Sequence, residues 1–200
     1  MIRGETVETR LHDEARRLAA LRDLQVLDTP PEEHVEAVCR TAERLFGVRA
    51  AFVSLVDADR MWLKTVCALV PPELPREASL CNHTIRTDAV LVASDLRRDP
   101  RFADLAIARE GSFGFYAGAP LVLAEGIRVG ALCLLDPEPR AFSEADAEAL
   151  ADLARVVVAH LRLHGANARH RVEAEARRAH EATITALDNL GPDAEVVIAA

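Results

Sequence analysis

The sequence predicts an α+β fold, a mostly antiparallel β-sheet with helices at both ends of the chain. The first observation is the order of the elements, because two helical segments precede a series of hairpin-connected strands and a long helix follows them. The second is the pattern within the elements: apolar residues step by three and four near the ends and form short runs bounded by turn residues in between. With 200 residues and 50% hydrophobic content, the chain can bury one compact domain of about 150 residues with helical extensions.

Two helices are predicted before the first strand. The first covers residues 9–27, where apolar side chains at helical spacing alternate with charges: Leu11, Ala15, Leu18, Leu21 and Leu24. The second is expected to begin at Thr29, with Pro30 in the first helical position and Glu32 completing a capping box. It buries one face as far as Phe46 and ends at Gly47.

The middle of the chain predicts five strands, with a proline-rich loop over residues 69–80 and a short helix over 81–87 that Ser79 caps. Asp99 and Pro100 predict another helical turn by the same capping logic. Pro120 implies an edge position or a bulge, because proline cannot donate a ladder hydrogen bond. The strand ranges are 50–57, 61–68, 89–94, 113–123 and 127–136.

The C-terminal part predicts a long helix that begins after Ser143 as its N-cap. The helical tendency continues through the charged segment 166–188 and stops at Gly191 and Pro192. Both terminal helices are amphipathic, so they are expected to pack on the sheet, on each other or on a second chain. We expect four segments: 1–28, an N-terminal helix; 29–142, the core; 143–190, a signalling and dimerisation helix; and 191–200, a tail.

Charge and composition argue against several classes of protein. The net charge is −8, whereas a general nucleic-acid binder needs a basic face, so no nucleic-acid partner is expected. No apolar run approaches about 18 residues and the N-terminus has no apolar signal-peptide core, so no membrane association is expected either. Four scattered cysteines without a CxxC pair favour a cytoplasmic chain with reduced thiols.

An ordered string of short motifs between Asp57 and Asp136 resembles the GAF domains of bacterial signalling proteins. It reads DADRMWLK at 57–64, PREASLCNHTI at 75–85, SD at 94–95, DPRF at 99–102, FYAGAPL at 115–121 and GALCLLD at 130–136. Each motif alone is weak, but their order is specific, and the resemblance covers about residues 10–163.

The resemblance implies a GAF-like antiparallel sheet with terminal helices on one face and a loop-capped pocket on the other. It places eight residues around a small-molecule ligand: Trp62, Cys81, His83, Asp95, Phe102, Phe115, Tyr116 and Ala117. This chain departs from the family pattern at Leu80, where phenylalanine is common before the cysteine, and at Ala68, where glycine is common. Both departures reshape the site, so the identity of the ligand does not follow from the resemblance.

The function that this resemblance implies is a non-catalytic sensory or regulatory module. Its terminal helices would form a coiled-coil-like bundle in a homodimer and pass the state of the pocket to a downstream signalling protein. The competing hypothesis is a dimerisation scaffold with a collapsed pocket and no ligand. No GGDEF-like run, ATP-binding glycine-rich box or phosphate loop follows within the 200 residues.

Cys81 and His83 suggest further hypotheses for the site. A thiol in the first turn of a short helix, near Arg76 and His83, could act as a redox sensor, although a packing role is the simpler interpretation. Phytochrome-like GAF domains anchor a bilin through a cysteine closely followed by histidine, and haem bound by His83 is no more strongly favoured than bilin. Zinc needs four ligands and this pair supplies two, so no metal is expected.

Two more patterns have ordinary explanations. His160 and His164 share a helix face, where packing or surface histidines are the common case. Free methionine-(R)-sulfoxide reductases share the GAF fold and use several cysteines, but the spacing here differs. We expect Cys39 on a buried helix face and Cys67 and Cys133 in strands, where thiols are inert.

Overall fold

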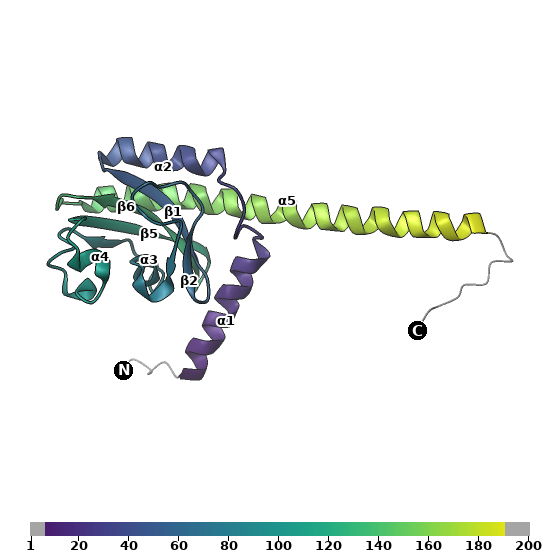
Figure 1. Ribbon diagram of the computed structural model, residues 1–200, viewed down its shortest axis with the longest axis horizontal. Coiled ribbons are helices and arrows are strands. Elements are labelled where there is room, and N and C mark those ends of the chain that lie inside the picture. The colour runs from purple at the N-terminus through teal and green to yellow at the C-terminus, as the bar shows by residue number, and fades with distance from the viewer. Residues whose placement is uncertain (1–6, 191–200) are drawn as a thin grey trace.

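A computed structural model describes residues 7–190 and confirms the α+β fold with a six-stranded antiparallel sheet. The strand order across the sheet is β3-β2-β1-β6-β5-β4, so the two long strands β5 and β6 lie together near its middle (Figure 1). The strands are β1 (Ala50–Val56), β2 (Arg60–Leu63), β3 (Glu73–Pro75), β4 (Leu91–Ala93), β5 (Phe115–Ala124) and β6 (Ile127–Asp136).

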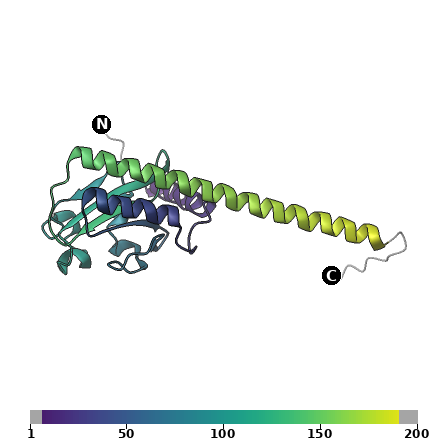
Figure 2. The same cartoon turned by 90° about the horizontal axis from the view of Figure 1, so that it is seen from above.

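Two long helices cover one face of this sheet, and two short helices lie on the other (Figure 1). The helices are α1 (Val7–Asp23), α2 (Glu33–Phe46), α3 (Cys81–Thr84), α4 (Ala106–Arg109) and α5 (Glu144–Leu190), with short 3₁₀ turns at Arg76–Ala78 and Pro100–Phe102. Figure 2 shows α2 and the first part of α5 side by side over the sheet, whereas α3 and α4 lie on the opposite side in Figure 1. Leu21, Val35, Phe115, Leu134 and Leu161 belong to the buried cluster on the α2–α5 face.

The close approach of β1 and β6 requires a glycine. Gly130 pairs with Leu55, and a Cβ atom there would overlap the carbonyl oxygen of Ser54. A second glycine, Gly126, turns β5 into β6 with φ of +73°, a conformation that glycine adopts at no steric cost. Glycine is therefore placed where β6 meets the backbone of β1 closely and where the chain turns with positive φ.

Several predicted boundaries are confirmed. Gly47 ends α2 in the left-handed conformation with φ of 60°. The carboxylate of Asp99 accepts a hydrogen bond from the Arg101 amide at 3.0 Å, and Ser143 Oγ accepts one from the Asp146 amide at 3.1 Å. The helix after Ser143 runs without interruption past Gly165, where a Cβ atom would lie 3.1 Å from the Cα of Leu24.

The predicted start of α2 is wrong, because the helix begins at Glu33 and not after Thr29. Thr29 Oγ1 instead donates to the Val26 carbonyl at 2.6 Å and accepts from Lys64 Nζ at 2.6 Å. Glu32 occupies the N-cap position without capping the helix, because its carboxylate contacts Lys64 Nζ at 2.7 Å. Pairing of a buried lysine outcompetes a local capping box here.

Two strand predictions also change. The second strand ends at Leu63, so Cys67 lies in the following loop and not in a strand, and part of the proline-rich loop forms β3. Pro120 lies beyond the last β5 residue that pairs with β4, and a register shift in the β5–β6 ladder follows directly. Both expected explanations of this proline, an edge and an irregularity, therefore apply.

The distal half of α5 projects away from the domain (Figures 1 and 2). Leu161 and Ala168 are buried, but from Arg169 to Thr185 almost every side chain is exposed. Among residues 7–190, no helix combines the length and the apolar character needed to cross a membrane. The predicted stop at Gly191 and the apolar tail lie outside the described residues, and the four-segment division remains a prediction.

Candidate functional site

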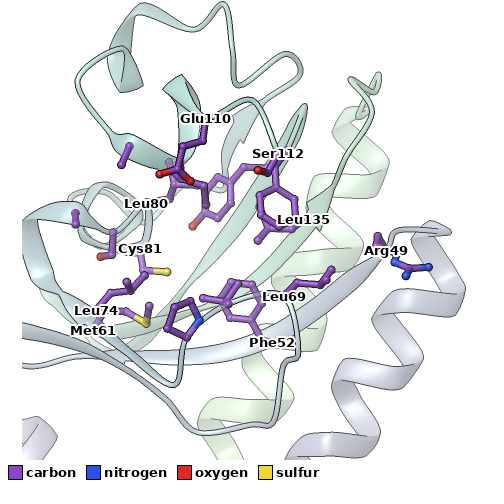
Figure 3. Close-up of a pocket in the computed structure, with 18 of the residues that line it drawn as sticks. Arg49, Phe52, Met61, Leu69, Leu74, Leu80, Cys81, Glu110, Ser112 and Leu135 are labelled. Carbon is purple, nitrogen blue, oxygen red and sulfur yellow. The ribbon is translucent and has the colours of Figure 1, made fainter.

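A cavity of about 670 Å³ lies on the face of the sheet that α2 and α5 leave free. Its sheet side consists of Phe52, Met61, Tyr116 and Leu135, which come from four strands. Figure 3 labels Phe52, Met61 and Leu135 among the lining side chains. The loop 68–71, the segment 78–81 and the α4 region 106–113 close it from the other side. Most of these lining groups are apolar.

The charged residues of the cavity stand at its periphery. Figure 3 shows Glu110 and Ser112 on the α4 side and Arg49 at the edge where β1 begins, whereas Cys81 lies in the interior. Glu110 and Arg49 are both exposed. The arrangement suits a compact ligand with an apolar body and a polar end directed toward the opening.

The floor of the cavity carries a buried cluster of thiols and hydroxyls. Cys81 Sγ lies 3.5 Å from Cys133 Sγ, and the Tyr116 hydroxyl lies 3.4 Å from Cys133 Sγ and 2.6 Å from Thr84 Oγ1. Ser54 Oγ completes the cluster at 3.9 Å from Cys133 Sγ. Because each group can donate and accept, the cluster satisfies its own polar atoms away from water.

Ionisation within this cluster is uneven. The contact with Cys133 lowers the pKa of the Cys81 thiol despite complete burial. Burial raises the pKa of Cys133 and of Tyr116 well above their ordinary values. Cys81 is therefore the group of the cluster that most readily carries a negative charge.

Gly118, two residues after Tyr116 on β5, leaves space for the hydroxyl groups of the cluster. A Cβ atom at this residue would overlap the Tyr116 hydroxyl and lie 2.7 Å from Thr84 Oγ1. The small residue next to the FYA motif is thus explained by the hydroxyl that packs over it.

Two of the eight predicted site residues, Cys81 and Tyr116, line the cavity. Phe102 is buried in the same hydrophobic cluster, behind the lining, and the half-buried ring of His83 packs edge-on against it at 5.2 Å between centroids. Burial, with Arg86 and Arg101 nearby, lowers the pKa of His83. Asp95 forms ion pairs with Arg97 and Arg98 and does not line the cavity.

Trp62, Phe115 and Ala117 correct the expectation, because they face the helices and not the cavity. Phe115 and Ala117 are buried in the cluster under α2 and α5, and Trp62 packs against it. Successive side chains of a strand point to opposite faces, so Tyr116 and its two neighbours cannot share one. The resemblance placed the whole Phe115–Ala117 segment at the pocket, whereas only its middle residue lines the cavity.

Phe52, Met61 and Leu135 also line the cavity but were not predicted from the sequence. Their strands were predicted, but the register between strands decides whether the odd-numbered or the even-numbered residues of a strand face the cavity. The usable signal was the alternation of side chains along each strand. Met61 is adjacent to Trp62 and so points to the opposite face, and Leu135, two residues beyond Cys133, points to the same face as that cysteine.

A second polar cluster joins α5, at His160 and His164, to Glu32 at the start of α2. Besides Lys64, the Glu32 carboxylate contacts His160 Nε2 at 2.6 Å and His164 Nδ1 at 3.0 Å. Lys64, the single lysine of the chain, is fully buried and also donates to the Pro30 carbonyl at 2.8 Å. The two histidines predicted to share a helix face therefore share one carboxylate.

The partners in this second cluster stabilise the ionised form of Glu32. Partial burial alone would raise the pKa of its carboxyl, but hydrogen bonds from Lys64 and His160 and the charges of Lys64 and His164 together lower it to about 2. Among the described residues 7–190, no group of three or more histidine, cysteine or acidic side chains has an arrangement that could hold a metal ion.

Comparison with known proteins identifies the fold family. The GAF domain model matches residues 30–161. A cyclic di-GMP phosphodiesterase of Pseudomonas aeruginosa is 35% identical over 151 residues, which are 74% of this chain but 26% of that protein, so the chain spans about a quarter of this relative.

Solved structures agree on the fold. The GAF domain of an Acinetobacter phosphoenolpyruvate-protein phosphotransferase superimposes with a TM-score of 0.55 at 18% identity, over 82% of this chain and 97% of that one. A type II free methionine-R-sulfoxide reductase from Thermoplasma acidophilum gives a TM-score of 0.53 at 12% identity, over 76% and 96% of the two chains. The matched range covers the whole sheet, the cavity and the first part of α5, from Glu144 to residue 161, and the chain belongs to the GAF domain family.

Proposed function

We propose that this chain is a non-catalytic GAF sensory module whose cavity binds a compact, largely apolar small molecule. The observation that carries the proposal is the open cavity of about 670 Å³ on the free face of the sheet, because ligand sites are usually concave, mostly apolar and pre-formed. A collapsed pocket would have favoured the dimerisation scaffold. The phosphodiesterase relative supports an input role in a larger signalling protein, in which a separate domain would carry the activity.

A short chain of contacts would connect the cavity to α5. Tyr116 forms part of the cavity wall, and the adjacent Phe115 emerges on the other face of β5. The Phe115 ring packs against Phe142 at 5.4 Å between centroids, and Phe142 directly precedes the cap of α5. A ligand that displaces Tyr116 would thus shift the start of the signalling helix, to the extent that its affinity differs between the two arrangements.

The module would act as a homodimer joined through its long helices. Val156 and Leu163, one heptad apart on α5, are 54% and 59% exposed, and Ile184, three heptads beyond Leu163, is also exposed. Leu11 of α1 is also exposed. Burial of these side chains between two chains would stabilise a helical bundle in a cytoplasmic signalling assembly.

Ligand binding is tested with a thermal-shift screen of cyclic nucleotides and small, largely apolar metabolites. A compound present at one hundred times its dissociation constant stabilises the fold by about 2.7 kcal/mol, which corresponds to roughly 5–10 °C for a domain of this size. Ala106→Phe places a ring in the cavity opening and should abolish the shift. Ala103→Phe is the matched control, because Ala103 is exposed in the same region but does not line the cavity.

The outcomes separate the sensor from the scaffold. A shift that Ala106→Phe removes and Ala103→Phe retains supports the sensor, and no shift across the library supports the scaffold. Colour after co-expression with a bilin or haem pathway would instead indicate a chromophore. Sedimentation velocity tests the dimer: Val156→Glu with Leu163→Glu should give monomers, while Val66→Glu, in an exposed loop, should not.

A further inference from the structure

Cys81 and Cys133 form a dithiol that only the fold brings together. They are 52 residues apart in sequence, one at the start of α3 and the other in the middle of β6, yet their Sγ atoms are 3.5 Å apart. A disulfide requires about 2.05 Å between sulfurs, so the two Sγ atoms must approach each other by about 1.5 Å to form one. This paired arrangement differs from the isolated Cys81 that the sequence suggested.

The two thiols have different access to small molecules. Cys81 lines the cavity, whereas Cys133 lies behind it among Ser54, Tyr116 and Cys81. A small oxidant that enters the cavity therefore meets Cys81 first. Cys133 is then the thiol in contact with whatever forms there.

The groups expected to activate Cys81 from sequence point elsewhere. Arg76 Nε donates to Asn82 Oδ1 at 2.9 Å and its Nη1 contacts Glu14, while His83 packs against Phe102. α3 is four residues long, too short to exert a helix-dipole effect. The feature that distinguishes Cys81 is its sulfur neighbour, whose contact favours the thiolate.

We propose that the cavity floor is a peroxide-sensitive modification site at which Cys81 and Cys133 form a reversible disulfide. In the first step the Cys81 thiolate attacks one peroxide oxygen, the O–O bond breaks, and the departing hydroxide takes a proton to become water. In the second, Cys133 Sγ attacks the resulting sulfenic sulfur, the S–O bond breaks and a second water leaves. The sum is two thiols and one hydrogen peroxide giving one disulfide and two waters.

Oxidation would alter the cavity. The bond replaces the thiol contact at the junction of α3 and the sheet and removes the S–H groups that face the Tyr116 hydroxyl. Since Tyr116 belongs to the cavity wall, the redox state and the shape of the site are coupled. This inference requires the cavity but no bound ligand.

Tryptic mapping of the wild-type chain tests it directly, because each cysteine falls on a different peptide. The peptides are 23–40 for Cys39, 65–76 for Cys67, 77–86 for Cys81 and 129–140 for Cys133. The folded, reduced protein is treated with hydrogen peroxide, its remaining thiols are alkylated in denaturant, and the digest is analysed without reductant. The expected product joins 77–86 to 129–140, weighs two hydrogens less than their sum, and disappears with dithiothreitol.

Variants assign the order of events and the route. In Cys133→Ser, Cys81 should stop at the sulfenic acid that dimedone traps; in Cys81→Ser, Cys133 should remain a thiol. Ala106→Phe should slow oxidation of Cys81 several-fold relative to Ala103→Phe if peroxide enters through the cavity. Equal rates in these two variants would indicate reaction of an unfolded form and overturn the cavity route.

Alkylation of both Cys81 and Cys133 after peroxide, or a cross-link between any other pair of peptides, overturns the proposal. The readout uses peroxide alone, so the result is independent of the thermal-shift screen. If the disulfide forms and no compound stabilises the fold, this inference stands and the ligand sensor is refuted. If a compound stabilises the fold and no disulfide forms, the sensor stands and this inference is refuted.

Discussion

Replacement of Lys64 by methionine probes the electrostatic junction between α2, β2 and α5. The lysine side chain is fully buried, contacts Glu32 Oε1 at 2.7 Å and donates to Thr29 Oγ1 and the Pro30 carbonyl. Removal of one partner of a fully buried ion pair costs about 3–5 kcal/mol. Glu32 is 25% exposed and keeps His160 and His164, so we expect a smaller loss of about 2–3 kcal/mol in the free energy of unfolding at pH 7.

The pH dependence of this loss follows from the pKa of Glu32. Its folded pKa of about 2 lies below the ordinary 4.5, so the carboxylate stabilises the fold fully above pH 4.5 and the stabilisation disappears as pH falls toward 2. Without Lys64 that pKa returns toward its ordinary value, so the variant loses less stability on acidification. The difference between wild type and variant should therefore narrow steadily from about pH 5.5 to 3.

Urea denaturation followed by circular dichroism at several pH values measures both effects. Arg60→Met is the matched control, because the two short ion pairs of Arg60 are with exposed carboxylates, Asp28 and Glu73, and its third, with Asp57, is long at 3.8 Å, so its loss should cost no more than about 1 kcal/mol. Glu32→Gln combined with Lys64→Met should cost less than the sum of the single changes. A Lys64→Met cost equal to that of Arg60→Met, or a difference that stays constant down to pH 3, would refute this account of the junction.

Three further changes test the packing around the cavity and the start of α5. Gly118→Ala should destabilise the fold by about 1–3 kcal/mol, because the new methyl overlaps the Tyr116 hydroxyl. The penalty should shrink in a Tyr116→Phe background, and a double-mutant cycle followed by urea denaturation measures this change. Tyr116→Phe alone should cost about 1–2 kcal/mol by depriving Thr84 Oγ1 of its 2.6 Å partner, and an unchanged midpoint would contradict the hydrogen bond. Ser143→Ala should cost about 1 kcal/mol through loss of the cap to the Asp146 amide, with compound binding unaffected in the thermal-shift assay.

Features with a local cause were predictable from the sequence. Gly47 ends a helix because it adopts a left-handed conformation without strain, and Asp99 and Ser143 cap the segments that follow because their side-chain oxygens reach nearby amides. The fold class followed from a series of hairpin-connected strands flanked by terminal helices and from the ordered GAF motifs. The helix ends and caps need only a few consecutive residues, whereas the fold class needs the order of motifs along the chain.

Features that depend on distant residues could not be predicted in the same way. Which of Phe115 and Tyr116 faces the cavity is decided by pairing with β4 and β6, and a shift of one residue would exchange them. The proposed cap at Thr29 failed because Lys64, 35 residues away, uses its hydroxyl. The contact of Cys81 with Cys133 depends likewise on how α3 lies on β6, which spacing alone does not reveal.

The central claim is that the face of the sheet opposite the helices binds a small molecule. The chain has one tyrosine and one tryptophan, and they lie on opposite faces: Tyr116 lines the cavity and Trp62 packs toward the helices. Fluorotyrosine and fluorotryptophan labelling therefore gives one ¹⁹F resonance for each face, and both are followed while the folded protein is titrated with the stabilising compound. The account predicts a saturable shift at Tyr116 with a much smaller change at Trp62; a shift at Trp62 with Tyr116 unmoved would place the ligand on the other side of the sheet and contradict it.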